Sequence, residues 1–102
     1  MEHTDLKSMT QQNLPEDQQI VRLFFKRSEK AITYTRQKYG SLCISVARRI
    51  LSDPRDAEEC VNDTYLHAWN AIPPEKPDSL KAFLARITRN LALDRYDYNT
   101  AD

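Results

Sequence analysis

The chain has 102 residues, 40% of them hydrophobic, and its 15 basic and 15 acidic side chains cancel to a formal net charge of zero. This length allows one domain with one core. A single glycine, Gly40, and few β-branched runs argue against a sandwich or barrel and favour helices. No apolar run approaches the roughly 20 residues that span a membrane, and the N-terminus shows no signal-peptide pattern, so we expect a cytoplasmic protein without a membrane partner.

The N-terminal half predicts a tail and two helices. Residues 1–15 are polar and aperiodic, which is typical of a mobile tail, and the folded domain is expected over residues 16–102. Proline and two acids at 15–17 favour a first helix there. A second helix should start at Ser28, a potential cap, and run to Leu51. Gly40 lies within it and predicts a kink or a close helix approach. Its expected core stripe is Ile32, Thr35, Tyr39, Cys43, Val46 and Ile50.

The C-terminal half predicts two more helices separated by a proline-rich loop. Asp53 and Pro54 are typical of a helix start, and this third helix should reach about Ala71. Residues 73–77 include three prolines and are expected to form a stiff extended loop. Ser79 should cap a fourth helix with the apolar face Leu80, Phe83, Leu84, Ile87 and Leu91. The sequence therefore predicts an all-α protein, a compact bundle of about four helices.

The cysteines and histidines do not predict a metal site. Cys43 and Cys60 lack the CxxC spacing of a metal knuckle and the density of a disulfide scaffold, so we expect reduced core residues. A redox pair is the alternative. His3 and His67 are too isolated to complete a zinc site. We expect no metal and no other cofactor.

Charge is segregated along the chain. Residues 20–50 carry eight bases and one acid, residues 53–63 carry five acids and one base, and residues 76–95 carry five bases and two acids. An acidic block between basic blocks suggests two surfaces for two partners. Ordinary solvated helix faces are the alternative.

Helical spacing gives the third helix a core stripe and a polar face. The stripe comprises Ala57, Cys60, Val61, Thr64, Ala68 and Ile72, and the polar face comprises Glu59, Asn62, Asp63, His67 and Asn70. Leu66 falls in the middle of the polar face and Trp69 on its flank, a pattern typical of an interface with an aromatic anchor. The alternative is that Trp69 folds back into the core.

The fourth helix carries the complementary chemistry. Arg86, Arg89 and Asn90 are expected to point outward. Arginine can bind phosphate with two hydrogen bonds, and asparagine can both donate to and accept from a base edge. The proline-rich loop leads into this face, and a stiff loop suits the capture of an unstacked base. Asp97, on the same side, would repel phosphate.

Two runs together resemble region 2 of the extracytoplasmic-function (ECF) sigma factors. DAEECVNDTY at 56–65 resembles the family's region 2.2 signature DAED-x-x-Q-E-T-F, and Trp69 falls where the family has tryptophan. FLARITRNLALD at 83–94 resembles W-L-x-R-I-A-R-N-L-A-I-D. The resemblance covers roughly residues 18–98 and departs from the family at Asn62, Asp63 and Phe83.

The resemblance implies two partners, RNA polymerase core and promoter DNA. The third helix would bind the β′ clamp helices of polymerase through Glu59, Asn62, Asp63, Leu66 and Trp69. The loop and fourth helix would hold the non-template strand of the −10 promoter element, with a flipped base in a pocket walled by residues 73–79. The residues expected to bind DNA are Lys76, Lys81, Arg86, Arg89, Asn90 and Arg95. The resemblance also allows for an anti-sigma factor as a further partner.

The sequence bears on the extent of the protein and on two rival functions. Because the helix-turn-helix domain of region 4 is absent, we expect a fragment of a longer sigma factor. The rival binding function is a stand-alone helical DNA-binding regulator without polymerase contact. A hydrolase using Glu58, Glu59, Asp63 and His67 is not expected, because Glu58 and Glu59 point to different sides of the helix.

Overall fold

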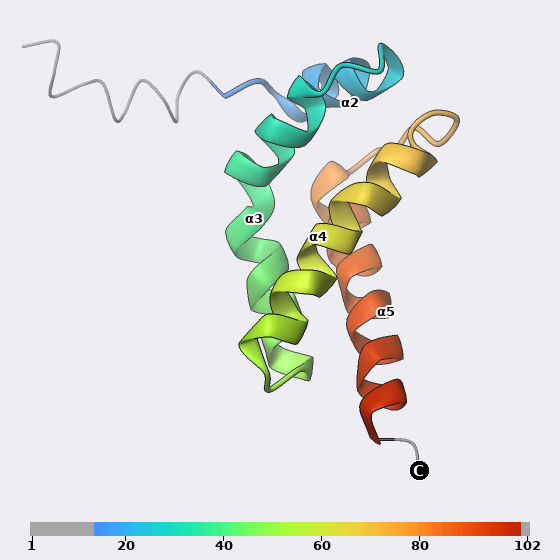
Figure 1. The fold of residues 1–102 in the computed structure, drawn as a ribbon. Coiled ribbons are helices and arrows are strands. Elements are labelled where there is room, and N and C mark those ends of the chain that lie inside the picture. Colours follow the sequence, from blue (N-terminus) through green and yellow to red (C-terminus); the bar gives the residue numbers. More distant parts are fainter. Residues whose placement is uncertain (1–13, 101–102) are drawn as a thin grey trace, which may run out of the picture.

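The computed structural model describes residues 14–100, and within them the chain forms four helices and no strands. The helices are α2 (Asp17–Phe25), α3 (Lys30–Ile50), α4 (Pro54–Ala71) and α5 (Leu80–Thr100). Each of α3, α4 and α5 packs against the other two, and α2 crosses the end of this group against α3 (Figure 1). The all-α prediction is confirmed. Most of the expected mobile tail, residues 1–13, lies outside the described residues.

The helix starts follow from side-chain caps. The Ser28 Oγ accepts from the Lys30 N–H at 3.3 Å, the Asp53 Oδ1 from the Arg55 N–H at 2.8 Å, and the Ser79 Oγ from the Ala82 N–H at 3.1 Å. Each satisfies a donor that has no partner in the first helical turn. The predicted bounds of the third helix agree with those of α4, whereas α3 begins two residues after Ser28.

The segment between α4 and α5, residues 72–79, is called the α4–α5 loop. It was predicted to be extended from 73 to 77, and this is wrong for its first part, because residues 72–74 form a turn. The Glu75 N–H donates to the Ala71 carbonyl at 2.9 Å, which satisfies one of the carbonyls left open at the end of α4. Residues 75–77 and 79 have no regular conformation, and residue 78 is a bend.

The core draws on all four helices, and α4 buries the stripe that helical spacing predicts, with Tyr65 added. On α3 the predicted stripe is confirmed at Thr35 and Cys43, and its other members are less buried than expected. The buried positions are Ala31, Thr35, Cys43 and Ala47, whereas Ile32, Tyr39, Val46 and Ile50 are half-buried. Small side chains at the centre of the α3 stripe let α4 and α5 come close. On α5, Thr88 and Ala92 are buried and Leu91 is only half-buried.

A polar cluster lies inside this core, between α4 and α5. The Oγ1 atoms of Thr64 and Thr88 are 2.9 Å apart, and each also lies within hydrogen-bond distance of a carbonyl one turn earlier in its own helix. The Cys60 thiol donates to the Thr88 carbonyl at 3.4 Å. Both cysteines are buried and free, as predicted. Burial raises the pKa of the Cys60 thiol from 9.0 to about 11 and also raises that of Cys43, which keeps both thiols protonated near neutral pH.

Gly40 lies where two helices approach closely. A Cβ atom added there would lie 3.3 Å from the Tyr65 hydroxyl of α4. The predicted close approach is confirmed, and α3 continues through this position without interruption.

No helix among residues 14–100 is both long and apolar enough to cross a bilayer.

Candidate interaction surfaces

The side of α4 that faces away from the core is polar with one large apolar residue at its centre. Leu66 is 59% exposed. It is surrounded by exposed polar side chains, and this set is called the α4 outer face: Glu59, Asn62, Asp63, Leu66, His67 and Asn70. The helical spacing placed these residues correctly, because α4 is regular over its whole length and its opposite side is buried.

Leu66 forms a ridge between two hollows. Towards α3 lies a hollow of about 330 Å³ lined by Glu29, Ile32, Tyr65, Leu66 and Trp69. Towards α5 lies one of about 400 Å³ lined by Asp63, Leu66, His67, Asn70, Ala71 and Leu91. Glu29 and Ile32 were missed in the sequence, because they belong to a different helix and no spacing rule connects them to Leu66.

Trp69 lies partly in the core and partly at the surface, so each of the two predicted positions of its side chain applies in part. The side chain is half-buried, and its ring lies 6.3 Å from that of Phe24, centroid to centroid, in the core. The Arg27 guanidinium lies 3.8 Å from the Trp69 ring centroid, a cation–π distance. The ring also borders the hollow beside Leu66. Trp69 is therefore partly a core residue, and only part of it is open to a partner.

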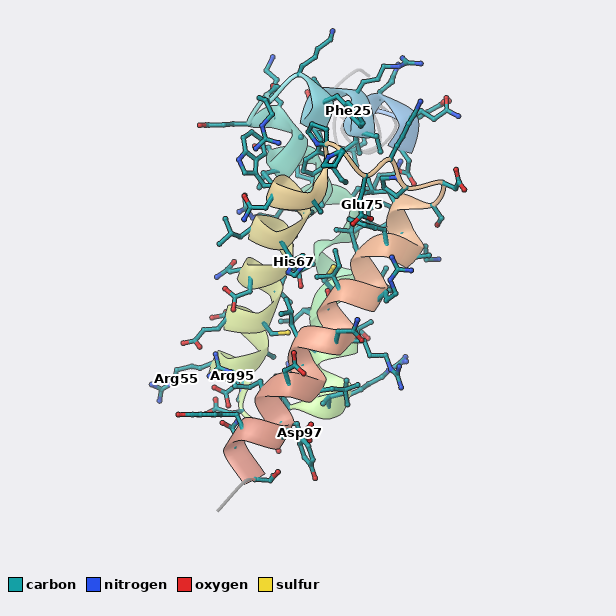
Figure 2. The ribbon with its side chains drawn as sticks, turned by 90° about the vertical axis from the view of Figure 1, so that its right-hand side faces the viewer. Phe25, Arg55, His67, Glu75, Arg95 and Asp97 are labelled. Carbon is teal, nitrogen blue, oxygen red and sulfur yellow. The ribbon has the colours of Figure 1, made fainter. Side chains whose placement is uncertain are left out.

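Arg95 sits among acids of α4. Its Nη2 donates to Glu59 Oε1 at 2.7 Å and its Nη1 to Asp56 Oδ1 at 3.3 Å. The Asn99 amide adds a hydrogen bond to Asp56 at 3.0 Å. Arg95 thus lies between α4 and α5, on the opposite side of α5 from Asp97 (Figure 2). The structure joins a residue predicted to bind DNA to one predicted to bind polymerase.

The remaining residues predicted to bind DNA are exposed but do not all share one face. Arg86, Arg89 and Asn90 follow one another at helical spacing on the outer side of α5. Lys81 is exposed about 140° around the helix from Arg86, at about 100° per residue. The charge of Arg95 is balanced by Asp56 and Glu59. Of the residues predicted to bind DNA, Arg86, Arg89 and Asn90 therefore share one side of α5, and Lys76 lies beside Arg86.

Lys76 meets this cluster at a hollow on one side of the α4–α5 loop. The hollow is about 300 Å³ and is lined by Glu75, Lys76, Pro77, Asp78, Ser79, Ala82, Phe83 and Arg86. Two acids and two bases line it, so it is dipolar and carries no excess of positive charge. Five of its eight lining residues belong to the α4–α5 loop.

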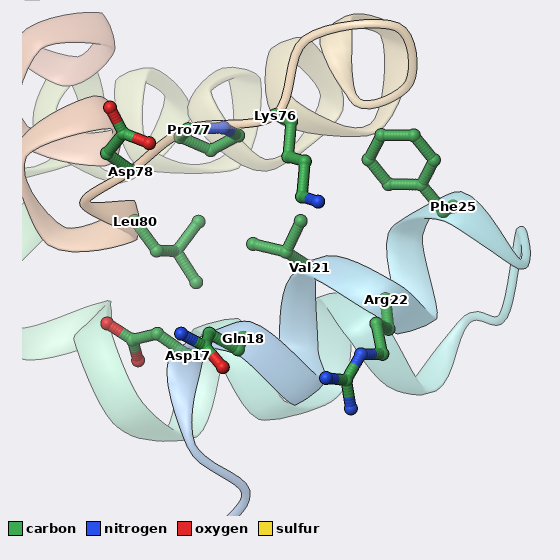
Figure 3. A pocket seen from close by; sticks show the side chains of 9 residues that line it. All are labelled: Asp17, Gln18, Val21, Arg22, Phe25, Lys76, Pro77, Asp78 and Leu80. Atoms are coloured by element: carbon green, nitrogen blue, oxygen red, sulfur yellow. The ribbon is translucent and has the colours of Figure 1, made fainter.

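A larger groove of about 530 Å³ lies on the other side of the loop, against α2. Val21 and Leu80 point into it, Lys76 lies across from Val21, and Phe25 stands at one end (Figure 3). The other lining residues are Asp17, Gln18, Arg22, Pro77 and Asp78. Nothing in the sequence indicated this groove, because α2 and the loop are about 50 residues apart and only the fold brings them together.

The α2 wall of the groove is anchored to α3. Asp17 forms an ion pair with Lys38 at 2.8 Å and accepts a hydrogen bond from the Tyr39 hydroxyl at 2.6 Å. Burial and this carboxylate raise the pKa of Tyr39, because both disfavour its charged form.

Among the described residues, no group of three or more His, Cys, Asp or Glu side chains is placed to hold a metal ion.

The fold and these surfaces define a class of structure: a small all-helical domain in which the acidic helix α4 adjoins the basic helix α5. The family model for sigma-70 region 2 matches residues 36–101, most of the chain. The chain therefore belongs to the sigma-70 region 2 family, a sigma-factor domain that acts in transcription initiation and promoter recognition with RNA polymerase and promoter DNA. No curated protein and no solved structure matches the chain. The matched residues include α4 and α5, whereas α2 lies outside them.

Proposed function

We propose that this domain is region 2 of an ECF sigma factor. It binds the β′ clamp helices of RNA polymerase with the α4 outer face, and it recognises and melts the −10 element with the α4–α5 loop and α5. The observation that carries the proposal is Leu66, exposed at the centre of an acidic face in a helix whose sequence resembles region 2.2.

The shape and charge of the α4 outer face support docking on a pair of helices. Leu66 stands between hollows of about 330 and 400 Å³, so a partner with two ridges could straddle it. Asp63 makes the rim acidic, which favours a basic partner and speeds its approach, whereas the charge of Glu59 is balanced by Arg95. An apolar centre within a polar rim is the usual composition of a specific interface.

The docking proposal is tested by titrating the chain with the β′ clamp helices. Asp63→Lys reverses a charge beside Leu66 and is expected to weaken binding at least roughly tenfold, since like charges across an interface cost several kcal/mol. Glu75→Lys makes the same change of charge outside the α4 outer face and should leave the affinity near that of wild type. If the wild-type chain does not bind the clamp helices, the stand-alone DNA-binding regulator becomes the better hypothesis.

The DNA half of the proposal rests on the cluster of Arg86, Arg89 and Asn90 next to the loop hollow. Melting needs no covalent chemistry, because unstacking costs a few kcal/mol per base and a pocket that holds the flipped base offsets this cost. Asp97 and the balanced charge of Arg95 leave few positive groups for the phosphates. We therefore expect weak binding to DNA in the absence of polymerase.

Fluorescence anisotropy with single-stranded oligonucleotides tests this half. The chain should prefer −10-like sequences over scrambled ones, and Arg89→Ala or Asn90→Ala should reduce the preference. Arg49→Ala, an exposed arginine on α3, is the matched control and should have no effect. Equal binding to every sequence, insensitive to these changes, would leave only polymerase docking.

A further inference from the structure

The turn between α2 and α3 holds Arg27 in a backbone conformation that side chains rarely adopt. Its φ is 57°, in the left-handed region. The Arg27 N–H donates to the Phe24 carbonyl and the Ser28 N–H to the Leu23 carbonyl, both at 2.9 Å. This is the Schellman pattern that closes a helix, in which glycine is the usual residue because a Cβ is crowded there. Arginine occupies this position against the preference of the backbone, which points to a role for its side chain.

The side chain of Arg27 reaches the end of α4. Its Nη1 donates to the Trp69 carbonyl at 2.8 Å and to the Ile72 carbonyl at 2.9 Å. Carbonyls in the last turn of a helix lack partners within the helix, and a positive charge at this end is favoured by the helix dipole. The guanidinium also lies over the Trp69 ring, 3.8 Å from its centroid. One side chain thus holds the backbone and the aromatic ring of the last α4 turn.

Arg27 donates hydrogen bonds to the carbonyls of Trp69 and Ile72, which lie where α4 ends and the α4–α5 loop begins. Ile72 is fully buried, and the prolines that follow it lead to Lys76, Pro77 and Asp78, which line the hollows on both sides of the loop. We propose that Arg27 is a positioning residue that fixes the base of the α4–α5 loop, so that the walls of both hollows are in place before a ligand binds. Its effect on DNA rests on the proposed function, because the −10 base is the ligand assigned to the loop.

Two glycine variants separate this role from general stability. Arg27→Gly gives the backbone the residue it prefers and removes all three side-chain contacts. Lys26→Gly places glycine one position earlier, where φ is −81°, and leaves the contacts of Arg27 intact. A merely structural role predicts that both variants lower the melting temperature without any selective effect on the loop.

Hydrogen–deuterium exchange of the full chain measures how often the backbone hydrogen bonds of the α4–α5 loop open. In Arg27→Gly, the amides of Ile72 and Glu75, which donate to α4 carbonyls, should exchange roughly tenfold faster than in wild type, as expected for the loss of hydrogen bonds to a charged group, while α5 amides keep their rates. Emission from Trp69, the single tryptophan, should shift to longer wavelength as the guanidinium cover is lost. Lys26→Gly should show neither effect. Unchanged loop exchange in Arg27→Gly overturns the proposal, as does an equal rise throughout the chain.

The second readout is base selectivity in the complex with polymerase core. Arg27→Gly should lose most of the preference for a −10 strand over a scrambled one. A retained preference overturns the proposal. If wild type itself shows no preference while the loop of Arg27→Gly still exchanges faster, the proposed DNA function fails and the positioning role stands. Should Arg27→Gly not fold, Arg27→Lys takes its place, because a single ammonium cannot stack as a plane and bridge both carbonyls.

Discussion

Truncation of Leu66 should separate binding from folding. Leu66 is 59% exposed, and full burial of a leucine contributes about 1.5–3 kcal/mol, so covering its exposed part at an interface contributes about 1–2 kcal/mol. Leu66→Ala should therefore weaken binding to the β′ clamp helices roughly 5- to 30-fold. It should change the free energy of unfolding by no more than about 0.5 kcal/mol, as is usual for a surface substitution.

Leu84→Ala is the matched substitution inside the core. Leu84 is fully buried, and its truncation should cost about 2–5 kcal/mol of stability. For a domain of this size that lowers the melting temperature by roughly 10 °C or more. Thermal unfolding by circular dichroism and titration with the clamp helices measure the two quantities on each variant. A Leu66→Ala chain that unfolds as early as Leu84→Ala, or that binds like wild type, would refute the assignment of Leu66 to an interface.

Three further outcomes follow from particular contacts. Thr88→Val should lower the free energy of unfolding by about 1 kcal/mol, because the Thr88 hydroxyl forms hydrogen bonds inside the core. Thr35→Val should leave the melting temperature unchanged or raise it, since the buried Thr35 hydroxyl has no partner among the described residues. The melting temperature should fall between pH 9 and 11, because the folded chain keeps the Cys60 proton that the unfolded chain loses. Cys60→Ala should flatten this part of the pH profile. An unchanged slope would contradict the raised pKa of the Cys60 thiol. Arg95→Ala should tighten binding to the clamp helices at low salt, because it releases the carboxylate of Glu59. It should weaken oligonucleotide binding less than Arg89→Ala does. An equal loss of oligonucleotide affinity would mean that Arg95 also binds DNA.

The sequence predicted α4 best because every signal there agrees. A capping aspartate, a proline in the first turn and a regular apolar stripe all favour the same helix in the same phase. The stripe of α3 was predicted correctly at Thr35 and Cys43 but not at its ends, because hydrophobicity ranks Ile32 and Val46 above their buried neighbours Ala31 and Ala47. In the fold the small residues lie at the helix crossings, where backbones approach each other, and the larger ones pack at the edges.

The candidate site could be predicted only where its residues share one helix. The α4 outer face depends on the period of a single helix, which the sequence contains in full. The contacts of Arg27 with Trp69 and of Arg95 with Glu59 join residues 42 and 36 positions apart, and pairing at that range is set by the packing of helices. The groove against α2 was missed for the same reason.

In the proposed function the α4–α5 loop holds a flipped base, and its proline content limits the hydrogen-bond donors that its backbone offers to that base. Three of the eight residues from 72 to 79 are prolines, which leaves five N–H groups, and those of Ile72 and Glu75 donate to carbonyls of α4. The loop backbone therefore has at most three donors to offer and is rich in acceptors. Such a surface pairs best with a base edge that donates, such as the exocyclic amino group of adenine or cytosine. Thymine, which carries a carbonyl at that position, is the base that this loop should tolerate least.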